Sequence, residues 1–256
     1  MSGLLYNLGK KIGPKARKAK WMWQSIAGTE ADSIKAEQEV GQDLAHRIRH
    51  HLAQDEKTEQ ILNEIGHRLA ACVANKYRTF SFETVKGTEP NAFALPGGFI
   101  FVTRSLIELC QWNRDEVAFI LAHEMAHVIR GHAMDRIISN SVINAASRAA
   151  PNRGRLSGLL RRVSIQFLQS AYSRDLESEA DKLSVHLVSA AGYKPHACLQ
   201  LLSRLAKQSS ADSQFNLGNY LSSHPRLRVR MHNLNRLLQH FHHQEQIVKN
   251  IESIKP

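Results

Sequence analysis

The sequence has little cysteine, no long uncharged segment and two stretches without any acidic residue, and each absence narrows what the chain can be. Its three cysteines, Cys72, Cys110 and Cys198, lie far apart, and an odd number cannot pair completely within one chain. This usage favours a reducing compartment and unpaired thiols over a disulfide-stabilised fold. The 256 residues are 43% hydrophobic and 22% charged, which is enough apolar material for a core and excludes a disordered or collagen-like chain.

Segments that would cross or target a membrane are also missing from the sequence. The longest uncharged run, residues 90–103, is shorter than the about 20 residues that a bilayer-spanning helix needs, and it contains two prolines and two glycines. The basic start of the chain has no continuous apolar region ahead of a cleavage site, so no secretory signal peptide is expected. We therefore expect a protein that is cytoplasmic or peripheral on a membrane face.

The excess of positive charge is local. The formal net charge is +11, from 34 lysines and arginines against 23 acidic residues. Residues 1–29 carry six basic residues and residues 136–174 carry seven, with no acid in either segment, so the other 188 residues are close to neutral. Two such segments predict contact with an anionic membrane surface or a client, with a solvated tail and a solvated connection as the plain alternatives. Nucleic acid is not expected as a partner, because no recognised binding module is present and aromatic residues do not interleave with the basic runs.

The pattern of apolar residues predicts an α+β, mostly helical fold with a small sheet of about three strands and about eight helices. Residues 1–29 are expected to form a basic N-terminal appendage, and residues 30–256 a single domain. Apolar residues at helical spacing from residue 31 to about residue 75 predict two amphipathic helices.

Three β-prone segments follow, and the rest of the chain is predicted to be helical. Residues 80–85, 91–95 and 98–102 are the expected strands, the last two joined by a proline-glycine turn. Ser105 and Asn113 stand at the start of capping patterns and are expected to begin the next two helices.

The clearest functional pattern is His123-Glu124-Met125-Ala126-His127, in the helix that Asn113 begins. Residues i and i+4 lie about 40° apart around a helix, so both imidazoles can reach one metal ion. Glu124 can then face the remaining position of the metal and accept a proton from a water that attacks a carbonyl group. The pattern alone is weak, since shuffling this composition produces it in about 4% of cases, and a surface helix rich in histidine and glutamate is the alternative.

A third ligand has to come from elsewhere in the chain. The metzincin arrangement is excluded because Ala133 stands where that family has its third histidine, and His132 is expected on the opposite face of the helix. A later acidic segment supplies Glu177, which can complete the site, and Asp181, which can accept the second N–H of a ligand histidine. Glu179 points about 200° away from Glu177 and is a poorer candidate. The alternative reading is an ordinary acidic helix face.

Taken together, these segments resemble the gluzincin-type zinc endopeptidases, a family that includes the CAAX prenyl protease, the bacterial membrane protease HtpX and the Oma-type mitochondrial quality-control protease. The matching segments are Asn91-Ala-Phe-Ala-Leu-Pro-Gly-Gly98, Phe101-Val-Thr103, Leu121 to Val128, Gly131-His132, Ser173-Arg174, Glu177-Ser-Glu-Ala-Asp181, and Ser223-His224-Pro225 with Arg230. They cover about residues 31–240 in the order of the family. They look closest to the soluble Oma-like and periplasmic chaperone-protease branch, because the hydrophobic spans of the other members are missing. The resemblance implies a zincin-like metalloprotease domain over residues 30–256.

The resemblance also implies a catalytic centre. His123, His127 and Glu177 would bind one zinc ion per chain, Glu124 would be the general base, and Asp181 would support a ligand histidine.

Three further elements of the family imply roles around that centre. Residues Asn91, Ala92, Phe93 and Ala94 look like an edge strand to which an extended substrate adds by main-chain pairing, with an ordinary hairpin as the alternative. Arg230 would stabilise the oxyanion that forms at the attacked carbonyl. His224 would be an inhibitory fourth ligand or would help to bind substrate, with a polar surface histidine as the alternative.

The function implied is that of a zinc-dependent endopeptidase that hydrolyses unfolded or membrane-associated polypeptides in protein quality control. One alternative is a proteolytically silent, zinc-containing protein that binds clients or membranes. Glu124 argues against it, because a purely structural zinc site needs no general base. The other alternative is a basic nucleic-acid-binding helical protein in which the histidine pattern is a coincidence.

Overall fold

The computed structural model describes residues 29–51, 56–137, 171–210, 220, 223, 224 and 226–252. The predicted basic appendage, apart from Thr29, and most of the arginine-rich segment 136–174 lie outside the described residues, as does Pro225.

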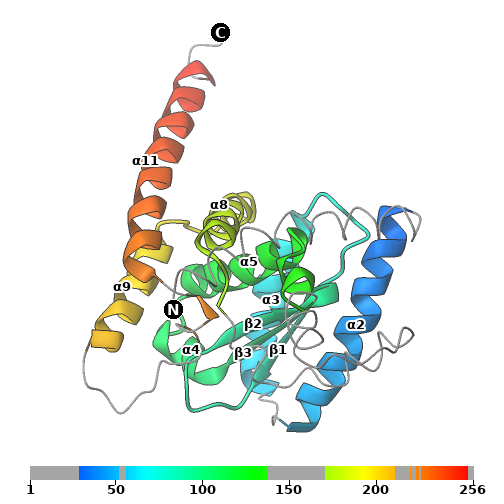
Figure 1. Ribbon diagram of the computed structural model, residues 1–256. Coiled ribbons are helices and arrows are strands. Elements are labelled where there is room, and N and C mark those ends of the chain that lie inside the picture. Colours follow the sequence, from blue (N-terminus) through cyan, green and yellow to red (C-terminus); the bar gives the residue numbers. More distant parts are fainter. Residues whose placement is uncertain are drawn as a thin grey trace, which may run out of the picture.

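The fold is α+β and mostly helical, as predicted. Its elements in chain order (Figure 1) are α2 (Glu30–His51), α3 (Glu56–Ala71), β1 (Ser81–Val85), β2 (Ala92–Leu95), η1 (Pro96–Gly98), β3 (Phe99–Thr103), α4 (Arg104–Leu109), α5 (Arg114–Ile129), α8 (Arg174–Ala190), α9 (Ala197–Ser210) and α11 (Leu227–Glu252). Among the residues in these ranges, no helix is both long enough and apolar enough to cross a membrane.

The three predicted strands form one sheet in the order β1-β3-β2. The central strand β3 pairs in parallel with β1 and antiparallel with β2, so β2 lies at an edge of the sheet. The turn η1 joins β2 to β3, and Gly97 has a φ of 76°, a conformation that favours glycine. A Cβ atom at Gly97 would lie 2.5 Å from the Cα atom of Gln38, because α2 packs directly against this turn.

Side chains that alternate along the strands build a core on each face of the sheet. Ala92, Ala94, Ile100 and Val102 pack into the larger core, together with residues of α3, α5, α8, α9 and α11. Phe93, Leu95 and Phe101 point the other way and pack against α2. The sheet therefore separates α2 on one side from α3 and α5 on the other (Figure 1).

Helix α5 is buried along almost its whole length. Asn113 caps it as predicted, because its side chain accepts hydrogen bonds from the backbone N–H groups of Asp115 and Glu116 at 3.0 and 3.4 Å. Every residue from Glu116 to Val128 is buried. A helix that is enclosed in this way holds its side chains in defined positions, which suits a site built from them.

The predicted helix start at Ser105 is wrong. Helix α4 begins at Arg104, with Thr103 as its N-cap residue, and Ser105 lies inside the helix, where its hydroxyl donates to Oγ1 of Thr103 at 3.1 Å. Strand β3 runs directly into α4, so no loop exists in which Ser105 could cap the helix.

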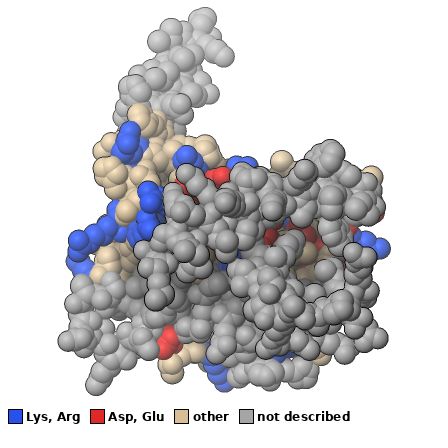
Figure 2. All heavy atoms as spheres, viewed as in Figure 1, with Lys and Arg blue, Asp and Glu red and all other residues tan. Residues whose placement is uncertain are grey.

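The surface carries basic side chains along α11. Arg226, directly before this helix, and Arg228 and Arg236 on it are exposed. Figure 2 shows blue spheres of lysine and arginine around this part of the molecule.

The three cysteines are free, as predicted, and Cys110 and Cys198 are buried.

Candidate metal centre

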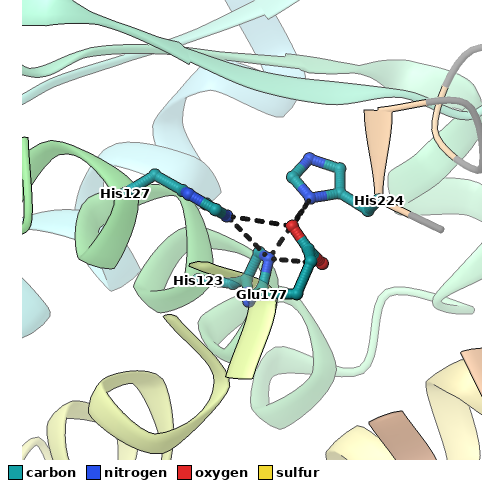
Figure 3. Close-up of side chains that lie close together, drawn as sticks. All are labelled: His123, His127, Glu177 and His224. Atoms are coloured by element: carbon teal, nitrogen blue, oxygen red, sulfur yellow. Dashed lines mark hydrogen bonds and ion pairs between the residues drawn. The ribbon is translucent and has the colours of Figure 1, made fainter. Parts of the chain in front are cut away.

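Four side chains from three parts of the chain meet in the interior of the protein (Figure 3). His123 and His127 lie one turn apart on α5, Glu177 lies in the first turn of α8, and His224 lies just before α11. Each is at most 2% exposed. One potential ligand atom from each of the four lies within 4.8 Å of the others. The structure thus brings the two histidines of α5 together with Glu177, as the sequence predicts, and it places His224, for which the resemblance implied a fourth-ligand or substrate-binding role, in the same group.

The spacing and chemistry of these atoms fit a zinc ion. The two Nε2 atoms of His123 and His127 are 3.2 Å apart, Nε2 of His127 is 3.3 Å from Oε1 of Glu177, and Nε2 of His123 is 3.3 Å from Nδ1 of His224. Neighbouring donor atoms around tetrahedral zinc are about 3.3 Å apart when each lies about 2.0–2.1 Å from the ion. Imidazole nitrogen and carboxylate oxygen are ordinary zinc ligands, and facing them toward one another in a buried site is costly unless a cation or proton lies between them.

Asp181 lies behind His123 on the side away from the four-residue group. Its Oδ1 atom is 3.1 Å from Nδ1 of His123. An N–H at Nδ1 donated to this carboxylate leaves the lone pair of Nε2 directed toward Glu177 and His127. Burial raises the pKa of Asp181, but the guanidinium of Arg230 and His123 outweigh it, so the pKa lies below its ordinary value and the carboxylate is ionised.

Arg230 lies at the same site, in contact with Glu177 and Asp181 of α8. Its Nε and Nη2 atoms donate to Asp181 at 3.0 and 2.7 Å, and its Nη1 atom lies 3.0 Å from Oε2 of Glu177. Burial raises the pKa of Glu177, yet His224 and Arg230 hold it well below its ordinary value. These contacts are compatible with a residue that positions Glu177 and Asp181, but Nη1 has no hydrogen-bond partner among the described residues, so the oxyanion-stabilising role of Arg230 stays a prediction.

Glu124 is buried beside the group without belonging to it. Its Oε1 atom is 3.3 Å from Nε2 of His224. Burial raises the pKa of Glu124, but His224, His127 and His123 outweigh this effect and lower it to about 2. The carboxylate is therefore ionised and can accept a proton.

The imidazole of His224 bridges two carboxylates. Its Nδ1 atom lies 3.0 Å from Oε1 of Glu177, on the opposite side of the ring from Glu124. Burial lowers the pKa of His224, but Glu177 and Glu124 outweigh it and raise the pKa to about 9. By contrast, burial dominates at His127 and lowers its pKa to about 3. In the protein without metal, His224 therefore carries the positive charge between the two glutamates.

Two aromatic side chains, those of Tyr172 and His132, lie against His127. Neither contact was predicted from the sequence. The ring of Tyr172 stacks on the ring of His127, with centroids 3.8 Å apart and planes at 16°. His132 lies with its Nδ1 atom 3.1 Å from Nδ1 of His127. The expectation that His132 is on the opposite helix face is wrong, because α5 ends at Ile129 and Gly131, with a φ of 74°, turns the chain back. The glycine directly before His132 is the sequence signal that could have indicated this turn.

The outer edge of β2 carries main-chain groups that do not face β3. The N–H of Thr103 donates to the carbonyl of Asn91 at 2.8 Å, just before β2 begins. Pairing alternates along an antiparallel ladder, so Ala92 and Ala94 direct their N–H and C=O groups away from β3. The guanidinium of Arg136 donates to the carbonyl of Ala94 at 3.4 Å and lies over the ring of Tyr172, 4.4 Å from its centroid.

Comparison with known proteins gives consistent matches. The model of peptidase family M48 matches residues 56–238. The mitochondrial metalloendopeptidase OMA1 of Schizosaccharomyces pombe is 28% identical over 176 residues, which are 68% of this chain and 51% of the relative. The beta-barrel assembly-enhancing protease of Yersinia pestis is 31% identical over 173 residues, 62% of this chain and 35% of the relative. The mitochondrial metalloendopeptidase OMA1 of Arabidopsis thaliana is 33% identical over 147 residues, 57% of this chain and 29% of the relative. The chain thus spans about half the length of these curated relatives, or less.

Proposed function

The chain belongs to peptidase family M48, and from this premise we propose that it is a zinc-dependent metalloendopeptidase that hydrolyses unfolded or membrane-associated polypeptides in protein quality control. The observation that carries the proposal is the ionised, buried carboxylate of Glu124 beside a cluster of histidine and glutamate donor atoms. The similar proteins are named as metalloendopeptidases and as a protease, which supports the reaction class.

In this proposal, His123, His127 and Glu177 hold one zinc ion per chain. When bound there, zinc would polarise the carbonyl of the scissile peptide bond and lower the pKa of the attacking water. Glu124 accepts the proton of that water as its oxygen bonds to the carbonyl carbon, and returns the proton to the leaving amide nitrogen. Asp181 and Arg230 keep His123 and Glu177 in their ligand orientations.

We propose that substrate binds as an additional strand along β2. Ala92 and Ala94 are buried in this structure, and their main-chain groups face away from β3, where an extended peptide that reached them would pair through its backbone and not its side chains. Asn91 and Phe93 complete this segment of chain. Recognition of this kind favours polypeptides without stable structure, which is why unfolded proteins are the proposed substrate class.

His224 is proposed to act as a gate. A catalytic zinc site keeps one position open, and His224 supplies a fourth donor atom that would close it. In the protein without metal, the same imidazole is protonated and keeps the pKa of Glu124 near 2, which makes Glu124 a weak base at neutral pH. Movement of His224 away from the cluster would open the metal position and would remove the imidazole from beside Glu124.

The four-donor arrangement also favours a second candidate function. His123, His127, Glu177 and His224 together could fill all four positions around a zinc ion, and a closed four-coordinate site is typical of structural zinc. A proteolytically silent protein that contains zinc and binds clients or membranes is therefore the alternative.

Zinc content and cleavage of casein, measured on the wild type and two variants, separate these functions. We expect one zinc per chain in all three proteins, since neither Glu124 nor His224 belongs to the proposed set of three ligands. Glu124→Gln should lose about 100- to 10,000-fold in cleavage rate, the usual contribution of a general base. His224→Ala should cleave faster than the wild type, by up to about tenfold if the open form is a tenth of the population.

The outcomes contradict different parts of the proposal. Wild-type protein without stoichiometric zinc would remove the metal site. Full activity in Glu124→Gln would remove its role as base, and zinc-loaded protein that is inert in wild type and His224→Ala alike would favour the silent alternative.

The distribution of basic residues supports a proposal for the cellular location of the protein. We propose a cytoplasmic protein, or one peripheral on a membrane face, that meets anionic lipid through residues 1–29 and 136–174. The local excess of basic residues in these two segments supports this contact. The proposed division is a basic appendage over residues 1–29 and one metalloprotease domain over residues 30–256.

A further inference from the structure

Each ligand histidine of α5 has a second ring nitrogen that needs a partner. At His123 that nitrogen, Nδ1, faces the carboxylate of Asp181. At His127 no carboxylate takes this place among the described contacts, and Nδ1 instead faces Nδ1 of His132 at 3.1 Å. His132 is 3% exposed, so this contact is buried and excludes solvent as an alternative partner.

The positions of the atoms determine where the protons must be. Nε2 of His127 faces Glu177 and His123, so it needs its lone pair free for a metal, and the ring proton must be on Nδ1. Nδ1 of His132 then has to be the acceptor, which places the proton of His132 on Nε2. That Nε2 atom lies 3.5 Å from Oε2 of Glu179, a carboxylate on α8.

We propose that His132 and Glu179 form an orienting relay that holds His127 in its metal-binding tautomer. In this relay, Nδ1–H of His127 donates to Nδ1 of His132, and Nε2–H of His132 is directed toward Glu179. The inference rests on the proposed metal site and adds two positioning residues to it. Neither residue reaches the reacting atoms.

Local backbone structure explains how His132 reaches this position. The positive φ of Gly131 reverses the direction of the chain at the end of α5, and the N–H of Asp135 donates to the carbonyl of Gly131 at 3.0 Å as the next helical turn begins. His132 therefore lies beside His127, although the two residues are five positions apart. A regular continuation of α5 would have directed the imidazole elsewhere.

The two ligand histidines are supported unequally. Asp181 is buried and paired with Arg230, so its orientation is well defined. Glu179 is 54% exposed, and its contact with His132 is longer. We therefore expect His132 to contribute much more to metal retention than Glu179 does.

Zinc dissociation constants, measured by competition with a chromophoric chelator, test the relay without relying on catalysis. His132→Leu keeps the apolar volume but removes the acceptor, and we expect its affinity for zinc to fall about 10- to 100-fold, as for other residues that orient metal ligands. His132→Asn should retain most of the affinity, because its amide oxygen can take the place of Nδ1. Glu179→Leu should lose less than His132→Leu.

His232→Leu is the matched control, since His232 is exposed on α11 and belongs neither to the metal centre nor to the relay, and the affinity of this variant should equal that of the wild type. Unfolding of the metal-free proteins in urea checks that His132→Leu is folded. Nitrogen-15 NMR of the zinc-loaded wild type gives a second readout that needs no variant: His132 should be the Nε2–H tautomer.

The results distinguish the relay from the proposed function. A wild-type chain that binds no zinc contradicts both. A wild type that binds zinc, with unchanged affinity in His132→Leu or with His132 as the Nδ1–H tautomer, contradicts the relay alone.

Discussion

The imidazole of His224 decides the charge balance at the centre of the molecule. It lies between Glu177 and Glu124, and the two carboxylates together stabilise its protonated form more than burial opposes it. Both glutamates are themselves kept ionised by this cation, because His224 lowers the pKa of each. Zinc binding and protonation of His224 are thus alternative ways to neutralise the same pair of negative charges.

The stability of the metal-free protein should therefore fall as the pH rises from 6.5 to 9. The pKa of His224 is about 9 in the folded state against an ordinary 6.5, so over this range the folded protein holds a proton that the unfolded chain has lost. The stabilisation is complete below pH 6.5 and disappears as the pH passes 9, and its size is on the order of 3 kcal/mol. Urea unfolding of the metal-free protein at pH 6 and pH 9 measures the difference.

His224→Gln provides the control for this dependence. The variant should lose most of the decrease, with a remainder from His123, whose pKa burial lowers but its carboxylate partners raise overall. A wild type whose stability is the same at both pH values would contradict the charged state assigned to His224, as would a variant with the full decrease.

At the scale of elements, the edge strand β2 and helix α5 are linked through two side chains. Arg136 donates to the outward-facing carbonyl of Ala94 and lies over Tyr172, and Tyr172 stacks on His127. An added substrate strand would need the carbonyl of Ala94 for its own main-chain hydrogen bond. In the proposed mode of substrate binding, the guanidinium of Arg136 and the substrate would therefore compete for one acceptor.

Arg136→Ala should consequently lower KM for an unfolded substrate. A hydrogen bond of 3.4 Å is weak, and removing the need to replace it is worth about 0.5–1 kcal/mol, or a decrease in KM of about two- to fivefold. The value of kcat should change little, because Arg136 does not contact Glu124 in the described structure. Arg130→Ala, at an exposed position just after α5, is the control. A rise in KM would mean that Arg136 helps to bind substrate.

At the scale of the whole molecule, the positive charge is distributed unevenly. The chain outside residues 1–29 and 136–174 carries 21 basic and 23 acidic residues, although the formal net charge is +11. Clustered basic residues attract anionic lipid through a field that falls off within a Debye length, about 10 Å at 0.1 M salt. We therefore propose that the charge gives the protein a defined orientation at a membrane and not a general affinity for polyanions.

Sedimentation with liposomes tests this orientation. We expect the protein to bind vesicles that contain anionic lipid at low salt, to bind less at physiological salt, and not to bind neutral vesicles, because each screened basic residue contributes about 1 kcal/mol. A variant with glutamine at the six basic positions of residues 1–29 should bind more weakly. Absence of sedimentation with anionic vesicles at either salt concentration would contradict the proposed membrane contact.

Local patterns allowed much of the fold to be predicted. The three strands, the helices before them and the cap at Asn113 depend on residues close together in sequence, where spacing and capping chemistry act directly. The expected start at Ser105 failed because the strand before it continues straight into a helix, which is a property of the packed sheet and not of the capping pattern.

In the candidate site, too, some features follow from residues close together in sequence and others depend on packing. His123 with His127, and Glu177 with Asp181, are pairs one helical turn apart, so the geometry of a single helix brings each pair to one side. The contact of His132 with His127 depends on the backbone of Gly131, and the stacking of Tyr172 depends on where α8 begins relative to α5. Neither contact can be predicted from the spacing of residues along the chain.

The sequence by itself determined the class of fold, the pair of histidines with their neighbouring glutamate, the acidic pair Glu177 and Asp181 as candidates to support them, and the local origin of the positive charge. Only the tertiary structure decided that His224 joins the ligand cluster, that Arg230 is engaged by Glu177 and Asp181, and that Glu179 lies next to His132. The physical reason is distance along the chain. Interactions within one or two helical turns follow from backbone geometry, whereas contacts between α5, α8 and the start of α11 exist only once the shared core has packed these elements together.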